Sequence, residues 1–104
     1  MIVVVEPGRA RLHNAHDYTA IEVAVPQSLH PDEVASALSA SALGGVVGDS
    51  LHLDVAGLAR MLRLHNAYAP RWFAAAVGCA GVSGWVREGD RLRRVISVGP
   101  SEQR

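Results

Sequence analysis

Three side chains that could carry acid–base or metal chemistry fall close together in the first part of the chain. His13, His16 and Asp17 belong to a polar stretch, residues 7–17, between two segments with strand-like patterns. An aspartate near an imidazole can orient the ring as a general base, and both residue types are common metal ligands. Because long loops on a rigid scaffold often carry function, we predict a loop here and a candidate polar site.

The rest of the sequence adds little to this candidate chemistry. Metal sites use three or four protein ligands, and His30, His52 and His65 stand singly without ligand spacing. The chain contains no GxSxG nucleophile motif and neither glycine-rich phosphate motif, GxxxxGK[ST] or GxGxxG. We therefore predict no catalytic residue, no metal ion and no cofactor, and we rank an enzyme below a binding protein.

Length and composition favour one folded domain. The chain has 104 residues, of which 49% are hydrophobic, so we predict a single domain over residues 1–100 and a frayed tail at 101–104. Ten basic and ten acidic residues cancel. The whole molecule therefore has no net charge that would draw it to nucleic acid or to an anionic membrane.

The single cysteine and the apolar segments bear on the compartment. Cys79 cannot form an intramolecular disulfide, which favours a reducing environment. Its neighbours are small and apolar, so we predict a buried, unreactive thiol. No signal peptide pattern opens the sequence, and the apolar run at 72–82 is shorter than the roughly 20 residues of a membrane span. We predict a cytoplasmic protein that does not interact with membranes.

The alternation of apolar and polar residues predicts a small α+β domain. We predict strands at 2–6 and 18–26, a helix from Asp32 to about Leu43, a left-handed exit at Gly44-Gly45, a hairpin or a single strand within 46–54, helices that start after Asp54 and at Pro70, and a closing hairpin at 84–98. The predicted order is β-β-α-β-α-α-β-β, with a mostly antiparallel sheet packed on two or three helices.

The helix predicted at 70–82 is unusually apolar. Arg71 is the only charged residue between Pro70 and Val86. Gly78 and Gly81 each destabilise such a helix by about 1 kcal/mol relative to alanine, so we expect another backbone to pack closely there. A helix this apolar needs burial around most of its circumference, and a small core offers limited room.

We therefore predict that a protein partner or a second copy of the chain, as in a homodimer, covers part of this helix. Tryptophan, tyrosine and arginine dominate the energetics of protein interfaces. The candidate interface residues are Tyr68, Arg71, Trp72 and Trp85. In a small core each tryptophan is more often a packed anchor, and the sequence leaves that alternative open.

The last third of the chain offers a different function. The segments VAGLARMLRL, RWFAAAVGCAGV and GWVREGDRLRRVISV, with "LAR" and "GWVRE" as the closest matches, resemble the helix-turn-helix and wing of winged-helix DNA-binding domains. For residues 54–98 the resemblance implies a DNA-binding function. The arginines that would contact phosphates from the hairpin are Arg87, Arg91, Arg93 and Arg94.

Exposure of the 70–82 helix separates these hypotheses. An exposed face with Arg71 beside a basic hairpin favours DNA binding, whereas burial against the core or a subunit favours an interaction domain. A recognition helix presents several polar side chains to the bases, which this segment lacks. We therefore rank protein–protein interaction first, DNA binding second, and a small-molecule binder or enzyme using the 7–17 stretch third.

Overall fold

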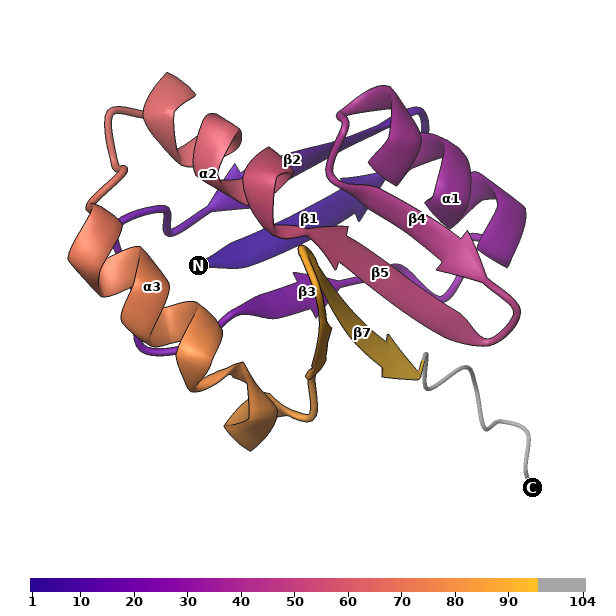
Figure 1. The fold of residues 1–104 in the computed structure, drawn as a ribbon. Coiled ribbons are helices and arrows are strands. Elements are labelled where there is room, and N and C mark those ends of the chain that lie inside the picture. The colour runs from indigo at the N-terminus through magenta and orange to yellow at the C-terminus, as the bar shows by residue number, and fades with distance from the viewer. Residues whose placement is uncertain (96–104) are drawn as a thin grey trace.

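The computed structural model describes residues 1–95 of the chain (Figure 1). Its elements, in chain order, are β1 (Ile2–Glu6), β2 (Arg9–His13), β3 (Glu22–Ala24), α1 (Pro31–Ala40), β4 (Gly44–Val47), β5 (Ser50–Asp54), α2 (Val55–Leu64), α3 (Pro70–Gly78), the 3-10 helix η1 (Ala80–Ser83), β6 (Val86–Glu88) and β7 (Arg91–Val95). The predicted tail at 101–104 and the end of the predicted hairpin, 96–98, lie outside the described residues.

The α+β class is confirmed, and the strands form two small sheets. One sheet has the order β2-β1-β3, with β1 antiparallel to β2 and parallel to β3. The other is fully antiparallel, in the order β4-β5-β7-β6. The inner faces of the two sheets contribute to one hydrophobic core, and α1 and α3 lie at opposite ends of the molecule (Figure 1). Within residues 1–95, no helix has the length and hydropathy needed to cross a bilayer.

The polar stretch at 7–17 is not the loop that we predicted. After a two-residue turn at Pro7-Gly8, residues 9–13 form β2 and pair with β1 from Glu6↔Arg9 to Ile2↔His13. Ala10 and Leu12 point into the core, whereas the residues between them are exposed. Alternating polar and apolar side chains after a turn are typical of a strand, and this pattern in residues 9–13 was the local signal for β2.

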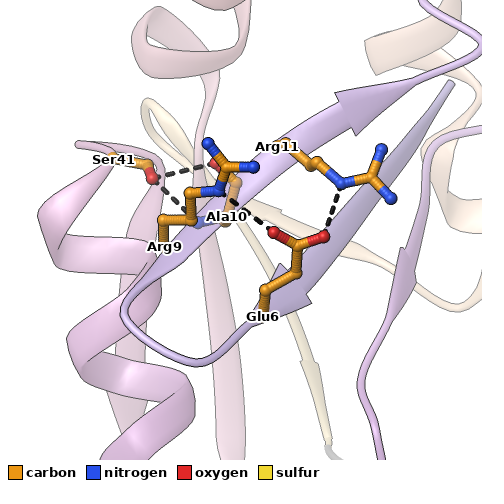
Figure 2. A network of polar contacts seen from close by, with 5 residues as sticks. All are labelled: Glu6, Arg9, Ala10, Arg11 and Ser41. Atoms are coloured by element: carbon orange, nitrogen blue, oxygen red, sulfur yellow. Dashed lines mark hydrogen bonds and ion pairs between the residues drawn. The ribbon is translucent and has the colours of Figure 1, made fainter.

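Two polar contacts secure this hairpin from outside (Figure 2). The hydroxyl of Ser41 accepts a hydrogen bond from the amide of Ala10 and donates one to its carbonyl, each at 2.9 Å. Ser41 thus occupies the free edge of β2, where another strand would otherwise pair. The carboxylate of Glu6 bridges Arg9 and Arg11, with Nε–O distances of 3.0 and 2.6 Å.

Residues 46–54 were predicted to form either a hairpin or a single strand. The structure shows a hairpin in the second sheet, with its turn at Gly48-Asp49. Gly44, predicted as part of a helix exit, is instead the first residue of β4. A Cβ atom there would lie 1.8 Å from the carbonyl oxygen of His52, so only glycine permits this strand pair to approach. The left-handed exit from α1 falls on Ala42, with φ +52°.

Asp32 and Asp54, which mark the predicted starts of two helices, make no side-chain bond that caps them. α1 starts one residue before Asp32, and its cap is His30, whose backbone amide donates to the Glu33 carboxylate at 2.9 Å. Asp54 does occupy the cap position of α2 but makes no side-chain cap bond. The first amide of α2, that of Val55, donates instead to the carbonyl of Asp90 at 2.9 Å.

Candidate functional site

An apolar groove of about 720 Å³ lies between the segment before β3 and the helical segment α3–η1. One wall consists of residues 16–21, which run beside α3 toward β3 (Figure 1). The lining side chains of the opposite wall are mostly small: Ala67, Ala69, Trp72, Ala75, Ala76, Cys79, Ala80, Val82 and Ser83. This volume falls within the range of about 300–1,000 Å³ that is typical of ligand pockets.

Tyr18 ties the two walls together. Its hydroxyl donates a 2.5 Å hydrogen bond to the carbonyl of Ala67 and accepts a 3.0 Å bond from the amide of Ala69. Both partners belong to the connection between α2 and α3, about 50 residues further along the chain. Because this contact fixes α3 relative to the 16–21 wall, the groove is a product of tertiary structure rather than of local sequence.

The 16–21 wall is stiffened by a turn centred on Asp17. Its Oδ1 atom accepts hydrogen bonds from the amide and the hydroxyl of Thr19, at 2.9 and 2.5 Å. The bond from the Thr19 hydroxyl has the largest effect on the pKa of Asp17, and the bond from the Thr19 amide the next largest. Both lower this pKa because they stabilise the ionised carboxylate. The backbone nitrogen of Met1 donates to the carbonyls of Asp17 and Ala20 and draws this turn against β1.

The helical wall exposes apolar side chains near both of its ends. α3 ends at Gly78 rather than continuing to 82, and η1 follows it. Phe73, Ala76 and Val77 are buried, but Trp72 is 68% exposed and lies at the groove. Val82, at the other end, is 92% exposed. The described chain by itself therefore leaves part of this helix uncovered, and the prediction that a partner covers that part stays a prediction.

We predicted that another backbone packs closely against Gly78 and Gly81, and this prediction was wrong. Among residues 1–95, an added Cβ at Gly78 or Gly81 would meet nothing within 4 Å, so no described backbone packs closely against either position. Cys79 was also predicted incorrectly, since it is exposed and lines the groove. Small neighbours in the sequence indicated burial, but here they form an open wall instead of an interior.

The two tryptophans have opposite roles. Trp85 is 3% exposed, and its indole nitrogen donates a 2.8 Å hydrogen bond to the carbonyl of Ile21. It is the packed anchor that the sequence left open as an alternative, and it positions the end of the 16–21 wall. Of the candidate interface residues, Trp72 lines the groove, whereas the half-buried Tyr68 packs against Phe73 outside the groove lining. Arg71 is exposed on α3 but is not a lining residue.

Two of the three residues of the predicted polar site line the groove. His16 and Asp17 line it, whereas His13 ends β2 and points to solvent. Among residues 1–95 no hydrogen bond joins His16 to Asp17, whose Oδ1 is engaged by Thr19. In the part of the chain that the structure describes, no three His, Cys, Asp or Glu side chains are placed to hold a metal ion.

The hairpin arginines do not form one basic surface. The strand register places Arg91 and Arg93 on the outer face of the second sheet and Arg87 and Arg94 on its opposite face. Arg93 pairs with Glu88 at 2.8 Å, and Arg87 donates to the carbonyl of Gly89.

Arg94 is likewise engaged within the fold. Its guanidinium carbon lies 4.5 Å from the centre of the Trp85 ring, and Nη1 reaches the Ser83 carbonyl and the Glu22 carboxylate, at 3.1 and 3.4 Å. Arg71 is exposed on α3, as the DNA-binding hypothesis requires. The hairpin arginines, however, are divided between two sheet faces, and three of the four are engaged within the fold, so they do not form the single basic face that the hypothesis also requires.

A second hollow, of about 550 Å³, lies along β4 on the outer face of the second sheet. His52, Asp54, Asp90 and Arg91 contribute its polar lining, and the buried Nδ1 atom of His52 has no hydrogen-bond partner among the described residues. Its glycine-rich wall offers few side chains that could bind a ligand. The larger groove is the better candidate because it combines apolar area with an exposed tryptophan.

Several lining residues were absent from the sequence-based site. Thr19, Tyr18 and Val82 belong to segments that were interpreted as a strand or as the end of a helix. No local pattern distinguishes them, because the walls meet through the long-range contacts of Tyr18 and Trp85.

Comparison of the chain with protein-family models, with curated proteins and with solved structures found no match.

Proposed function

We propose that this chain is a non-catalytic binding protein that accepts a segment of another polypeptide in the groove between residues 16–21 and α3–η1. The observation that carries this proposal is the exposure of Trp72, at 68%, on an apolar groove. Tryptophan is enriched at the energetic centres of interfaces, and a contiguous exposed apolar surface marks a binding site in a folded domain.

The shape of the groove supports an extended chain. Its helical wall comprises the nine residues of α3 and the four of η1. At about 1.5 Å and 2.0 Å of rise per residue, the combined length of these two helices along their axes is roughly 20 Å. An extended polypeptide covers that length with about six residues at 3.3 Å each. The small side chains along this wall leave room for apolar side chains of a bound segment.

The proposal includes both a different protein and a second copy of this chain as the source of that segment. Light scattering at increasing concentration separates the two cases. A mass that stays at one chain excludes self-association, whereas a dimer that is lost in Trp72→Ala supports a homodimer through this groove. The cytoplasmic location stays a prediction from the single cysteine.

Selection from a random peptide library tests the proposal directly. We expect selected peptides to shift the backbone amide resonances of 16–21 and 69–83 in nuclear magnetic resonance spectra of the full chain. Trp72→Ala should weaken binding by about 30-fold or more, which corresponds to a hot-spot residue of about 2 kcal/mol. Leu64→Ala is the matched control, because Leu64 is 74% exposed but does not line the groove. Failure to select any peptide that maps to these residues would contradict the proposal.

A second candidate function is binding of a small amphiphilic molecule. It is supported by the position of His16 and Asp17 at the same groove, which places polar groups beside apolar area. Screening a library of small organic fragments by the same resonance shifts tests it. Fragments that occupy the groove while no peptide does would favour this function over the first.

A further inference from the structure

We infer that the polypeptide segment bound in the groove carries a lysine or arginine among its apolar residues, and that this cation lies between the carboxylate of Asp17 and the ring of Trp72. This inference rests on the proposed function and specifies the chemistry of the partner. Three features of the groove support it: its charge, its open aromatic ring and its apolar wall.

The first feature is the charge of the lining. Asp17 is the only acidic or arginine side chain among the described lining residues. The N-terminal ammonium of Met1 lies close by, but it donates to the backbone carbonyl of Asp17 and not to its carboxylate. Both hydrogen bonds from Thr19 reach Oδ1, and within residues 1–95 no hydrogen bond or ion pair involves Oδ2. An anionic oxygen with free acceptor sites on an apolar groove is complementary to a cation that carries hydrogen-bond donors.

The second feature is the aromatic ring at the groove. Arg94 lies over Trp85 and Arg63 lies over Tyr68, each with its guanidinium carbon 4.5 Å from the ring centre. Among the described residues no cation lies over Trp72, although its ring is mostly exposed. Tryptophan is the strongest of the aromatic side chains in cation–π contacts. Trp72 is therefore an open site for a cation supplied by a partner.

The third feature is the apolar wall next to these two groups. Ala69, Ala75 and Ala76 offer apolar contacts but no charge. A wholly apolar segment would cover Asp17 without pairing its charge, and an acidic segment would be repelled by Asp17. Both segments would therefore bind less tightly than a segment with one basic residue. A segment that alternates apolar residues with one basic residue matches the charge, the ring and the wall together.

A scan with capped hexapeptides tests the inference. The probes alternate leucine and serine and carry a single arginine, moved through all six positions, and each has a twin with glutamine in place of arginine. We expect the arginine peptide of the best register to bind the full chain about tenfold more tightly than its twin, because a cation–π contact and a partly exposed ion pair together provide about 1.4 kcal/mol. Increasing salt should reduce this difference.

Asp17→Asn isolates the role of the charge. Asparagine keeps an Oδ1 acceptor for Thr19, so the turn is retained and only the anion is removed. We expect the preference for arginine to fall to threefold or less in this variant, at the scale of about 0.5 kcal/mol for a cation–π contact alone. Asp49→Asn, in the exposed turn between β4 and β5, is the matched control and should keep the preference unchanged.

The outcomes separate the two levels of the proposal. Equal binding of arginine and glutamine peptides, with loss of both in Trp72→Ala, overturns the inference and leaves the polypeptide-binding function in place. A tenfold preference that persists in Asp17→Asn also overturns it, because the cation would then be recognised elsewhere. No binding of any peptide at 16–21 and 69–83 contradicts the proposed function itself.

Discussion

The hydroxyl of Tyr18 donates to the carbonyl of Ala67 at 2.5 Å, and this contact joins the two walls of the groove across 49 residues of chain. The same oxygen accepts from the amide of Ala69, immediately before α3. One side chain thereby satisfies two backbone groups that have no other hydrogen-bond partner among the described residues. The groove depends on this connection, and its stability can be tested independently of any ligand.

Removing the Tyr18 hydroxyl should loosen the groove. We expect Tyr18→Phe to lower the free energy of unfolding by about 1–3 kcal/mol, because a partly buried amide and carbonyl lose their shared partner. Urea denaturation measures this change. Tyr68→Phe is the control, since the hydroxyl of Tyr68 makes no hydrogen bond within residues 1–95, and its loss should have little effect. Equal effects of the two variants would contradict the role of Tyr18.

Cys79 should react with a thiol reagent in the folded protein. Because the thiol is exposed at the groove, a disulfide reagent such as dithionitrobenzoate should modify one thiol per chain without denaturant. A peptide bound in the groove should slow this reaction, and Cys79→Ala provides the blank. A thiol that reacts only after unfolding would restore the prediction made from the sequence and would argue against an open groove.

Ser41 should stabilise the edge of β2. We expect Ser41→Ala to cost about 1–3 kcal/mol of unfolding free energy, because it removes the partner of both the amide and the carbonyl of Ala10 (Figure 2). Ser36→Ala is the control, since Ser36 is exposed on α1, the helix that Ser41 follows. Hydrogen exchange of the Ala10 amide provides a second measurement, and its protection should fall in Ser41→Ala alone.

The two neighbouring glycines at the start of β4 should differ sharply. In Gly44→Ala the new Cβ would lie 1.8 Å from the carbonyl oxygen of His52, and the backbone has φ +152°, so we expect a loss of about 2 kcal/mol or more. Gly45→Ala meets nothing within 4 Å and should change stability by about 0.5 kcal/mol or less. Thermal denaturation of the pair tests the register of β4 on β5, and similar melting temperatures would argue against it.

The Glu6 network should stabilise the protein only above acid pH. Hydrogen bonds from Arg11 and then Arg9 lower the pKa of Glu6, so the folded state binds its proton less readily than the unfolded state does. The stabilisation is therefore present above the ordinary pKa of a glutamate and is lost as the pH falls through the lowered value.

Glu6→Gln measures this dependence. We expect a lower urea midpoint than that of the parent chain at pH 7, a difference that shrinks in high salt because the group is exposed. At a pH below the lowered pKa the two midpoints should converge. A difference that is the same at pH 7 and in strong acid would show that the contribution does not come from the charge of Glu6.

Several features followed from local patterns in the sequence. The alternation of Leu51 and Leu53, the helical spacing of Leu58 and Leu62, and the Gly89-Asp90 turn were enough to predict β5, α2 and the β6–β7 hairpin. Each depends on residues within a few positions of one another, where backbone preferences and periodicity act directly. The α+β class follows from the order of these elements.

The candidate site could not be predicted in the same way. The exposure of Trp72 and the burial of Trp85 have no local signal, because each tryptophan has a large apolar neighbour and an arginine within two positions. The same is true of Cys79, which the sequence indicated as buried. Whether such a residue faces the core or a groove depends on which distant segment packs beside it.

The sequence by itself determined the class of fold, the positions of most elements and a core of one domain's size. Tertiary structure alone decided that the 16–21 segment lies against α3, that the hairpin arginines fall on opposite sheet faces, and that Asp17 and Trp72 share one groove. The physical reason is that periodicity reports only how much of each element is apolar. Long-range contacts such as those of Tyr18 determine which apolar faces cover one another and which remain open to a partner.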